Sequence, residues 1–308
     1  MPHATHLSIR PTILDYCLLL LLATLWGASY TFIKVGVATI PPVTFIAART
    51  LIAGLLLLAI IWLRGVRLPT DRRSWRQFAF QACMNSVVPF TLIAWAELTV
   101  DAGLAAILNS TSPIFTFLFT FLITRHEPAP ARKFLGVAAG LAGIALIIGF
   151  DAFGGLGTHF VAELAIILAT ICYAVAAIFG RRFHGLDPMA PAAGSLTAGA
   201  CLLVPLSLVV DRPWTLDPSA ASVAALFGLA IFSTALAFVI FFRLLKSLGS
   251  VGATSQAYLR VPIGVAIGVI FLGETLDPAD FFGLVLVVIG VAAMTWPTRS
   301  RPPRQADI

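Results

Sequence analysis

Asn109-Ser110-Thr111-Ser112-Pro113 interrupts an otherwise apolar run that extends from Ala102 to Thr124. A second apolar run, Gly249 to Leu272, carries Pro262 at the position that follows Pro113 by 149 residues. A proline inside a helix removes a backbone donor, so one carbonyl loses its partner. Breaks at matching places in two halves of an apolar chain are typical of a transport site that lies between the halves. We therefore predict a polar, proline-broken helix in each half, with Pro113 and Pro262 as hinges.

The composition predicts that most of the chain lies in lipid. The 308 residues are 59% hydrophobic and only 11% charged, with a mean hydropathy of +0.97. Globular domains carry about 25% charged residues, so this chain lacks the polar surface needed to meet water. The net charge of +6 is spread over short loops instead of forming one basic patch. We predict an integral membrane protein that binds no nucleic acid.

Ten apolar stretches are long enough to cross the hydrocarbon core of a bilayer, which takes about 20 helical residues. The stretches are 13–33, 42–63, 75–96, 102–124, 132–150, 160–180, 188–210, 220–242, 249–272 and 278–296. The connections between them are short and leave no room for a soluble domain. The sequence therefore predicts an all-α membrane protein with ten transmembrane helices.

The basic residues predict the orientation of these helices. With the N-terminus in the cytoplasm, sixteen of the 20 Lys and Arg residues fall in cytoplasmic segments, and only Lys34 and Arg212 fall in outer loops. Because cytoplasmic loops of membrane proteins are enriched in Lys and Arg, we expect both termini in the cytoplasm. The apolar run that begins at Ile13 is longer than the core of a signal peptide, so we take it as the first membrane helix.

The two halves of the chain repeat each other. Leu22-Ala23-Thr24 recurs as Leu168-Ala169-Thr170, and Glu127 recurs as Glu274, at intervals of 146 and 147 residues. Five helices per repeat is an odd number, so the second repeat enters the membrane from the opposite side. The predicted units are a cytoplasmic tail (1–12), two inverted five-helix repeats around a central cavity (13–150 and 151–297), and a second cytoplasmic tail (298–308).

These features together resemble the ten-helix drug/metabolite transporter superfamily, and in particular exporters built from two EamA-type repeats. The residues that carry the resemblance are Trp26-Gly27, Arg49, the series Gly103, Pro113, Glu127 and Gly136, and its copy Gly252, Pro262, Gly273-Glu274 and Gly283. The resemblance covers about residues 13 to 297 and is strongest to bacterial exporters of aromatic amino acids. It implies a central cavity lined mainly by helices 1, 3, 4, 6, 8 and 9, with helices 5 and 10 at the periphery.

Arg260 is the leading candidate for a binding residue. At a rise of 1.5 Å per residue it lies about 16 Å from Gly249, near the middle of a core about 30 Å thick. An unpaired guanidinium there costs about 2.5–3.5 kcal/mol, so it must face water or a partner. It could receive a substrate carboxylate, or it could bond the carbonyl freed by Pro262 and neighbouring polar side chains. Arg49 lies only about 10 Å below a helix end, which favours the interface, with gating or pairing as the alternative.

Polar and aromatic side chains on several helices are candidates to line the same cavity. The polar candidates are Asn85, Asn109, Ser112 and Gln256, and the aromatic candidates are Trp26, Tyr30, Trp95, Tyr173 and Tyr258. Aromatic walls suit a flat or apolar substrate. Each residue could instead make an interhelical contact, where a hydrogen bond contributes about 0.6 kcal/mol. We predict that the cluster as a whole forms a polar, aromatic substrate site.

The acidic and histidine residues limit the mechanism. We expect no Asp or Glu at mid-membrane, because Asp15 and Glu163 lie near helix ends and Glu97 falls in an outer loop. Proton antiport through a central carboxylate is therefore not supported, and Asp15 and Glu163 are the residual proton candidates. None of the five His residues is expected at mid-membrane, so we predict no metal site, no cofactor and no catalytic centre.

The sequence thus predicts a multi-pass inner-membrane exporter that is not an enzyme. We expect it to move small amphipathic metabolites, of which aromatic or bulky amino acids are the first candidates, by gradient-driven alternating access. A multidrug exporter for flat organic cations is one alternative, favoured by the aromatic residues and opposed by Arg260. A membrane scaffold or sensor without transport is the other. The expected partners are the substrate and the lipid bilayer, with no obligate protein partner.

Overall fold

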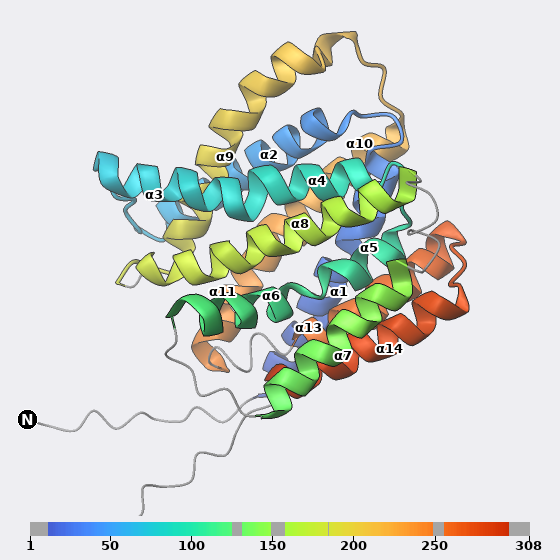
Figure 1. Cartoon of the computed structure of the whole chain (residues 1–308). Coiled ribbons are helices and arrows are strands. Elements are labelled where there is room, and N and C mark those ends of the chain that lie inside the picture. The colour runs from blue at the N-terminus through green and yellow to red at the C-terminus, as the bar shows by residue number, and fades with distance from the viewer. Residues whose placement is uncertain (1–11, 125–130, 149–157, 184, 249–255, 296–308) are drawn as a thin grey trace, which may run out of the picture.

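The computed structural model describes residues 12–124, 131–148, 158–183, 185–248 and 256–295, and the regular structure within them is helical (Figure 1). The α-helices are α1 (Ile13–Gly36), α2 (Pro42–Leu63), α3 (Arg72–Ala82), α4 (Val88–Ala96), α5 (Ala102–Asn109), α6 (Ser112–Phe119), α7 (Ala131–Ile148), α8 (Thr158–Phe179), α9 (Met189–Val210), α10 (Ala220–Phe227), α11 (Ala237–Ser247), α13 (Gln256–Ile267) and α14 (Pro278–Thr295). Wider π-helical turns continue several of these helices. Cys83–Val87 joins α3 to α4, and Gly228–Leu236 joins α10 to α11. Thr120–Thr124 extends α6, and Gly268–Leu272 extends α13.

Seven segments of the described chain are long and apolar enough to cross a membrane. They are Ile13–Gly36, Pro42–Leu63, Arg72–Ala96, Ala102–Leu122, Phe160–Phe183, Met189–Val210 and Ala220–Leu244, followed by two shorter apolar helices, Leu259–Leu272 and Pro278–Ala293. The three remaining predicted stretches contain α7, α13 and α14, each of which adjoins residues outside the described ranges. The structure is therefore an all-helical membrane protein, and the count of ten spans stays a prediction.

The predicted interruption at Pro113 is present. α5 ends at Asn109 and α6 begins at Ser112, so Ser110 and Thr111 separate two helices within one apolar run. In the described part of the second run, α13 continues without a break through Pro262, unlike the chain at Pro113, and a hinge at Pro262 stays a prediction. A membrane helix tolerates an internal proline where its surroundings satisfy or shield the freed backbone group.

Close contact with α1 helps to hold α13 in a continuous helix. A Cβ atom built on Gly27 of α1 would lie 2.9 Å from the carbonyl oxygen of Arg260, and one on Gly264 would lie 3.2 Å from that of Gly27. Small residues let two membrane helices approach to backbone contact, which replaces the hydrophobic effect as a source of packing energy in lipid. The contact therefore fixes α13, and with it Arg260, against α1.

The peripheral helices α7 and α14 pack along each other at one edge of the bundle (Figure 1). A Cβ atom on Gly143 would lie 2.8 Å from the carbonyl oxygen of Gly283, and one on Gly290 would lie 2.5 Å from that of Gly136. Residue numbers thus rise along α7 as they fall along α14, so the two helices run antiparallel.

Candidate functional site

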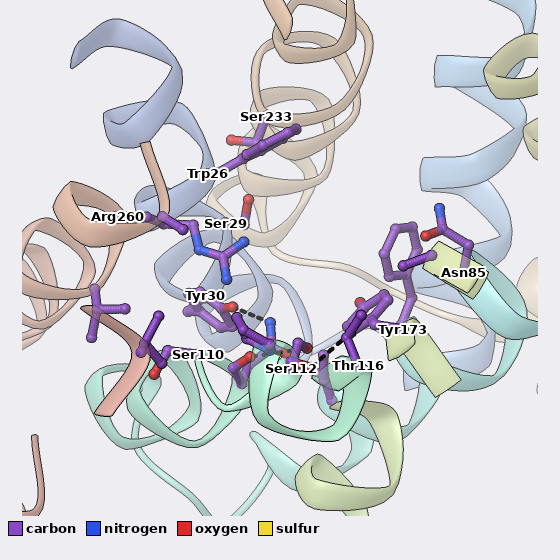
Figure 2. Close-up of a pocket in the computed structure, with 18 of the residues that line it drawn as sticks. Trp26, Ser29, Tyr30, Asn85, Ser110, Ser112, Thr116, Tyr173, Ser233 and Arg260 are labelled. Atoms are coloured by element: carbon purple, nitrogen blue, oxygen red, sulfur yellow. Dashed lines mark hydrogen bonds between the residues drawn. The ribbon is translucent and has the colours of Figure 1, made fainter. Parts of the chain in front are cut away.

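A cavity of about 600 Å³ lies inside the bundle and receives side chains from both halves of the chain (Figure 2). Predicted site residues line it from α1 (Trp26, Tyr30), α2 (Arg49), the π-helical turn before α4 (Asn85), α5 and α6 (Asn109, Ser112, Pro113), α8 (Tyr173) and α13 (Arg260). Phe90 of α4, Phe117 of α6 and Phe238 of α11 add apolar surface. The cavity thus combines aromatic walls with a small set of polar groups, as ligand sites commonly do.

Arg260 extends from α13 into this cavity, on the side where Ser29 and Tyr30 of α1 lie (Figure 2). Its Nε atom is buried and has no hydrogen-bond partner among the described residues. A buried donor without a partner is destabilising by about 1–3 kcal/mol, so this guanidinium is held by the packing of α13 on α1 with part of its hydrogen-bonding capacity unused.

Asn109 and Tyr30 connect α5 to α1 across the cavity. The side-chain amide Nδ2 of Asn109 donates a hydrogen bond to the Tyr30 hydroxyl, while the Oδ1 acceptor of Asn109 has no partner in the described part of the chain (Figure 2). The hydroxyl of Ser110 donates to the Ile107 carbonyl at 2.6 Å and that of Ser112 donates to the Asn109 carbonyl at 3.3 Å. The serine hydroxyls therefore donate hydrogen bonds to carbonyl groups at the helix break, while Oδ1 of Asn109 remains an acceptor without a partner among the described residues.

Arg49 lies at the cavity wall, so its expected position at the interface is wrong. The residue is only 6% exposed, its Nε donates to Oγ1 of Thr234 at 3.0 Å, and its guanidinium lies 3.8 Å from the ring centroid of Phe90. Distance from a helix end predicted snorkelling, but a hydroxyl acceptor and an aromatic face inside the bundle offer the cation a better environment.

The charges of the cavity have one sign. Its lining includes Arg49, Lys133, Arg181 and Arg260, and none of the described residues that line it is acidic. Lys133 lies in the first turn of α7 and Arg181 follows the end of α8, so the cavity reaches the helix ends that the charge distribution predicts to be cytoplasmic. The aromatic chamber thus leads to an opening lined with cations.

Comparison with known proteins identifies the architecture. Residues 14–149 and 160–296 each match the EamA-like transporter family. The chain belongs to this family. It is 30% identical over 275 residues to YedA, an uncharacterized inner membrane transporter of Escherichia coli (strain K12), with 88% of this chain and 87% of YedA aligned.

More distant relatives cover as much of the chain. A probable terminal-alkyne amino-acid exporter of Streptantibioticus cattleyicolor is 23% identical, over 92% of this chain and 94% of that protein. A solved crystal structure has the same fold, with a TM-score of 0.61 and 20% identity, over 92% of this chain and 96% of that one. This EamA-like protein is therefore a multi-pass inner-membrane transporter and not an enzyme.

The end of the EamA-like bundle opposite Lys133 and Arg181 is closed by hydrogen bonds between helices. Glu274, which follows Gly273 after the last turn of α13, accepts from the backbone amides of Ala102 at 2.7 Å and Gly103 at 2.8 Å. The carboxylate caps the N-terminus of α5, where the helix dipole also favours a negative charge. Lys34 of α1 donates to the carbonyl of Val100 at 2.7 Å and lies 3.8 Å from Asp101. This closed end is the one that we predict to face outward.

Glu97 is a functional candidate that the sequence analysis missed. Its expected position was an outer loop, but it lies in the turn after α4 with 0% of its surface exposed. The apolar run in the sequence ends near this residue, and its pattern does not indicate that the following turn folds back into the bundle. Only contacts with α1 and with the segment that follows α13 reveal its burial.

Three predicted site residues, Trp95, Gln256 and Pro262, do not line the cavity among the described side chains. Trp95 is 44% exposed, because it lies two positions from the cavity-lining Ile93 and so on another face of α4. Gln256 is buried on α13 with an unpartnered Oε1, and Pro262 faces outward from the same helix. The side chain of Tyr258 lies outside the described residues.

Several cavity residues had no distinctive sequence signal. Ser29, Thr116 and Ser233 line the cavity, but single hydroxyl residues are common in membrane helices. Over the described residues, no three His, Cys, Asp or Glu side chains group as metal ligands.

Proposed function

We propose that this transporter exports amphipathic carboxylates, with aromatic or bulky amino acids as the first candidates, by alternating access. The observation that carries the proposal is a cavity with aromatic walls, several cations and no acidic residue among its described lining. A volume of about 600 Å³ lies within the range of about 300–1,000 Å³ that small-molecule sites occupy. The name of the relative from Streptantibioticus cattleyicolor, a probable amino-acid exporter, supports the same substrate class.

The unused polar groups of the cavity match the two ends of a zwitterion. The guanidinium of Arg260 suits a carboxylate, since its planar donors pair with both oxygens. The free Oδ1 acceptor of Asn109 suits the ammonium group, with small rearrangements that expose it to the cavity. The side chain of the substrate would then rest on the rings of Trp26 and Tyr173.

Alternating access in this proposal uses a ten-helix, five-plus-five inverted repeat with both termini in the cytoplasm. The antiparallel contact of α7 with α14 supports the inversion. The packing of α1 on α13 supports it as well, because the corresponding helices of the other repeat, α8 and α6, also pack on each other. The break between α5 and α6 at Pro113 would let the two short helices rock, and Pro262 would serve as a softer hinge within α13. The cavity of this conformation would face the cytoplasm.

Uptake of labelled phenylalanine into proteoliposomes, without an ion gradient, tests the proposal. We expect uptake by the wild type and a loss of about 10- to 150-fold in Arg260→Gln, because a hydrogen bond to a charged group contributes about 1.5–3 kcal/mol. Arg67→Gln, at an exposed position, is the matched control and should transport normally. Equal uptake by wild type and Arg260→Gln would contradict the assigned role of Arg260.

The same vesicles separate the two alternatives. Uptake of a flat organic cation with no uptake of phenylalanine would favour the multidrug exporter, although the cationic lining opposes that substrate class. Absence of counterflow with every amino acid and organic cation offered would favour a scaffold or sensor.

A further inference from the structure

Glu97 carries a fully buried carboxyl group without a hydrogen-bond partner. It directly follows α4, has 0% of its surface exposed, and neither Oε1 nor Oε2 has a partner among the described residues. The backbone amide of Lys34 approaches the carboxyl but forms no hydrogen bond of normal geometry. An isolated carboxylate in such a place is strongly destabilising, whereas the neutral acid is tolerated.

The charged groups nearest to Glu97 are engaged elsewhere. Lys34 of α1 binds the carbonyl of Val100 and lies beside Asp101, while Arg49 of α2 binds Thr234. Glu274 is negative and caps α5. Burial raises the pKa of the Glu97 carboxyl well above its usual range; Lys34 and Arg49 oppose this rise, and Glu274 adds to it.

Position in the fold links this carboxyl to the closed end. Glu97 lies between Ala96 and Val100, which both belong to a buried apolar cluster of the bundle. Lys34 joins the turn after α4 to α1, and Glu274 joins the first residues of α5, which follow that turn, to the segment after α13. Separating these elements would admit water to Glu97, and a hydrated Glu carboxyl, with a pKa of about 4.3, is ionised at neutral pH.

We propose that Glu97 is a proton-binding site and that the closed end of the transporter, predicted to be external, closes only when the proton is bound. This inference rests on the proposed alternating access. On closing, a proton from external water forms an O–H bond with the Glu97 carboxylate, and on reopening the proton returns to that water. No proton needs to cross the membrane in this scheme.

The coupling makes the conformational equilibrium depend on external pH. The protein binds one proton more when this end is closed than when it is open. Acid therefore shifts the equilibrium towards the closed state, by up to about tenfold per pH unit between the pKa values of Glu97 in the two states. In an exporter, closure of the external end returns the unloaded binding site to the cytoplasmic side. External acid should therefore accelerate the return.

Infrared titration of the purified protein in lipid nanodiscs tests the proton site without any transported substrate. We expect a C=O band of a protonated carboxylic acid at pH 7 that Glu97→Gln removes and that Asp217→Asn, at an exposed outer position, leaves unchanged. Identical spectra of wild type and Glu97→Gln at pH 7 would overturn the proposal. Glu97→Asp keeps a carboxyl and should keep such a band, which guards against a general effect of substitution.

Transport supplies the second test. In counterflow, wild-type exchange should change with external pH, Glu97→Gln should be insensitive to it, and Glu97→Asp should restore a shifted dependence. An unchanged pH profile in Glu97→Gln would overturn the link between the proton and closure. If wild type moves no amino acid, the proposed function fails, while the infrared result still decides whether Glu97 binds a proton.

Discussion

Glu274→Gln should open the closed end of the transporter more often. The wild-type carboxylate accepts two backbone hydrogen bonds, from Ala102 at 2.7 Å and Gly103 at 2.8 Å. Glutamine retains one acceptor oxygen and presents an NH₂ group to the other amide donor, so one charge-assisted bond is lost. Such a bond contributes about 1.5–3 kcal/mol, which corresponds to a shift of about 10- to 150-fold toward the open end.

Cysteine accessibility measures this shift. Val37, near the end of α1, is only 5% exposed, so Val37→Cys should react slowly with a membrane-impermeant maleimide added from outside. The background must first replace the four native cysteines by serine, namely Cys17, Cys83, Cys172 and Cys201. In this background, Glu274→Gln should raise the labelling rate by about 10- to 150-fold if labelling follows the open population.

A matched control uses Asp217→Asn, which removes an exposed acidic residue and should leave labelling unchanged. Melting temperature and monodispersity report whether each variant is folded. An unchanged labelling rate in folded Glu274→Gln would refute the view that this carboxylate holds the end closed. A rate increase in Asp217→Asn as well would point to surface charge instead.

Three further predictions concern other parts of the chain. Gly143→Val should lower the melting temperature of the purified protein sharply, because even the first side-chain carbon would lie 2.8 Å from the carbonyl oxygen of Gly283; an unchanged melting temperature would contradict the packing. Asn109→Ala should raise the KM for phenylalanine by about 10- to 150-fold, since a hydrogen bond to the charged ammonium group contributes about 1.5–3 kcal/mol and α5 also loses its link to α1; an unchanged KM would remove Asn109 from the site. The bond from the Ser74 amide lowers the pKa of Asp71, so this cap stabilises α3 above the unfolded pKa and is lost as pH falls through the folded one; the protection factor of the Ser74 amide, which compares its exchange with the intrinsic rate at the same pH, should fall in acid in the wild type but show no such step in Asp71→Ala.

The sequence predicts a residue's environment correctly where the position of that residue along one helix determines it. An apolar run long enough to cross a bilayer has few other stable conformations, which is why the seven long apolar segments agree closely with seven of the predicted stretches. The sequence predicts Arg260 and Asn109 at mid-depth, where lipid is unfavourable for them, and both line the cavity as that prediction requires.

The same reasoning failed where the direction of a side chain or a distant partner decides. Arg49 is held by Thr234 and Phe90, which no count from a helix end can identify. Trp95 has the residue type of a cavity wall but the wrong face of α4. Glu97 shows the limit most clearly, because hydropathy assigns a turn to water whereas tertiary contacts can bury it completely.

The antiparallel crossing of α7 and α14 has the form of a homodimer interface. Gly136 and Gly283 occupy equivalent places in the two halves at an interval of 147 residues, as do Gly143 and Gly290. Gly143 meets Gly283 while Gly290 meets Gly136, so each helix offers its partner the same surface that it receives. Such isologous contacts normally join two copies of one subunit. This edge of the bundle would therefore keep its contacts if both helices came from two identical half-length chains that ran antiparallel to each other.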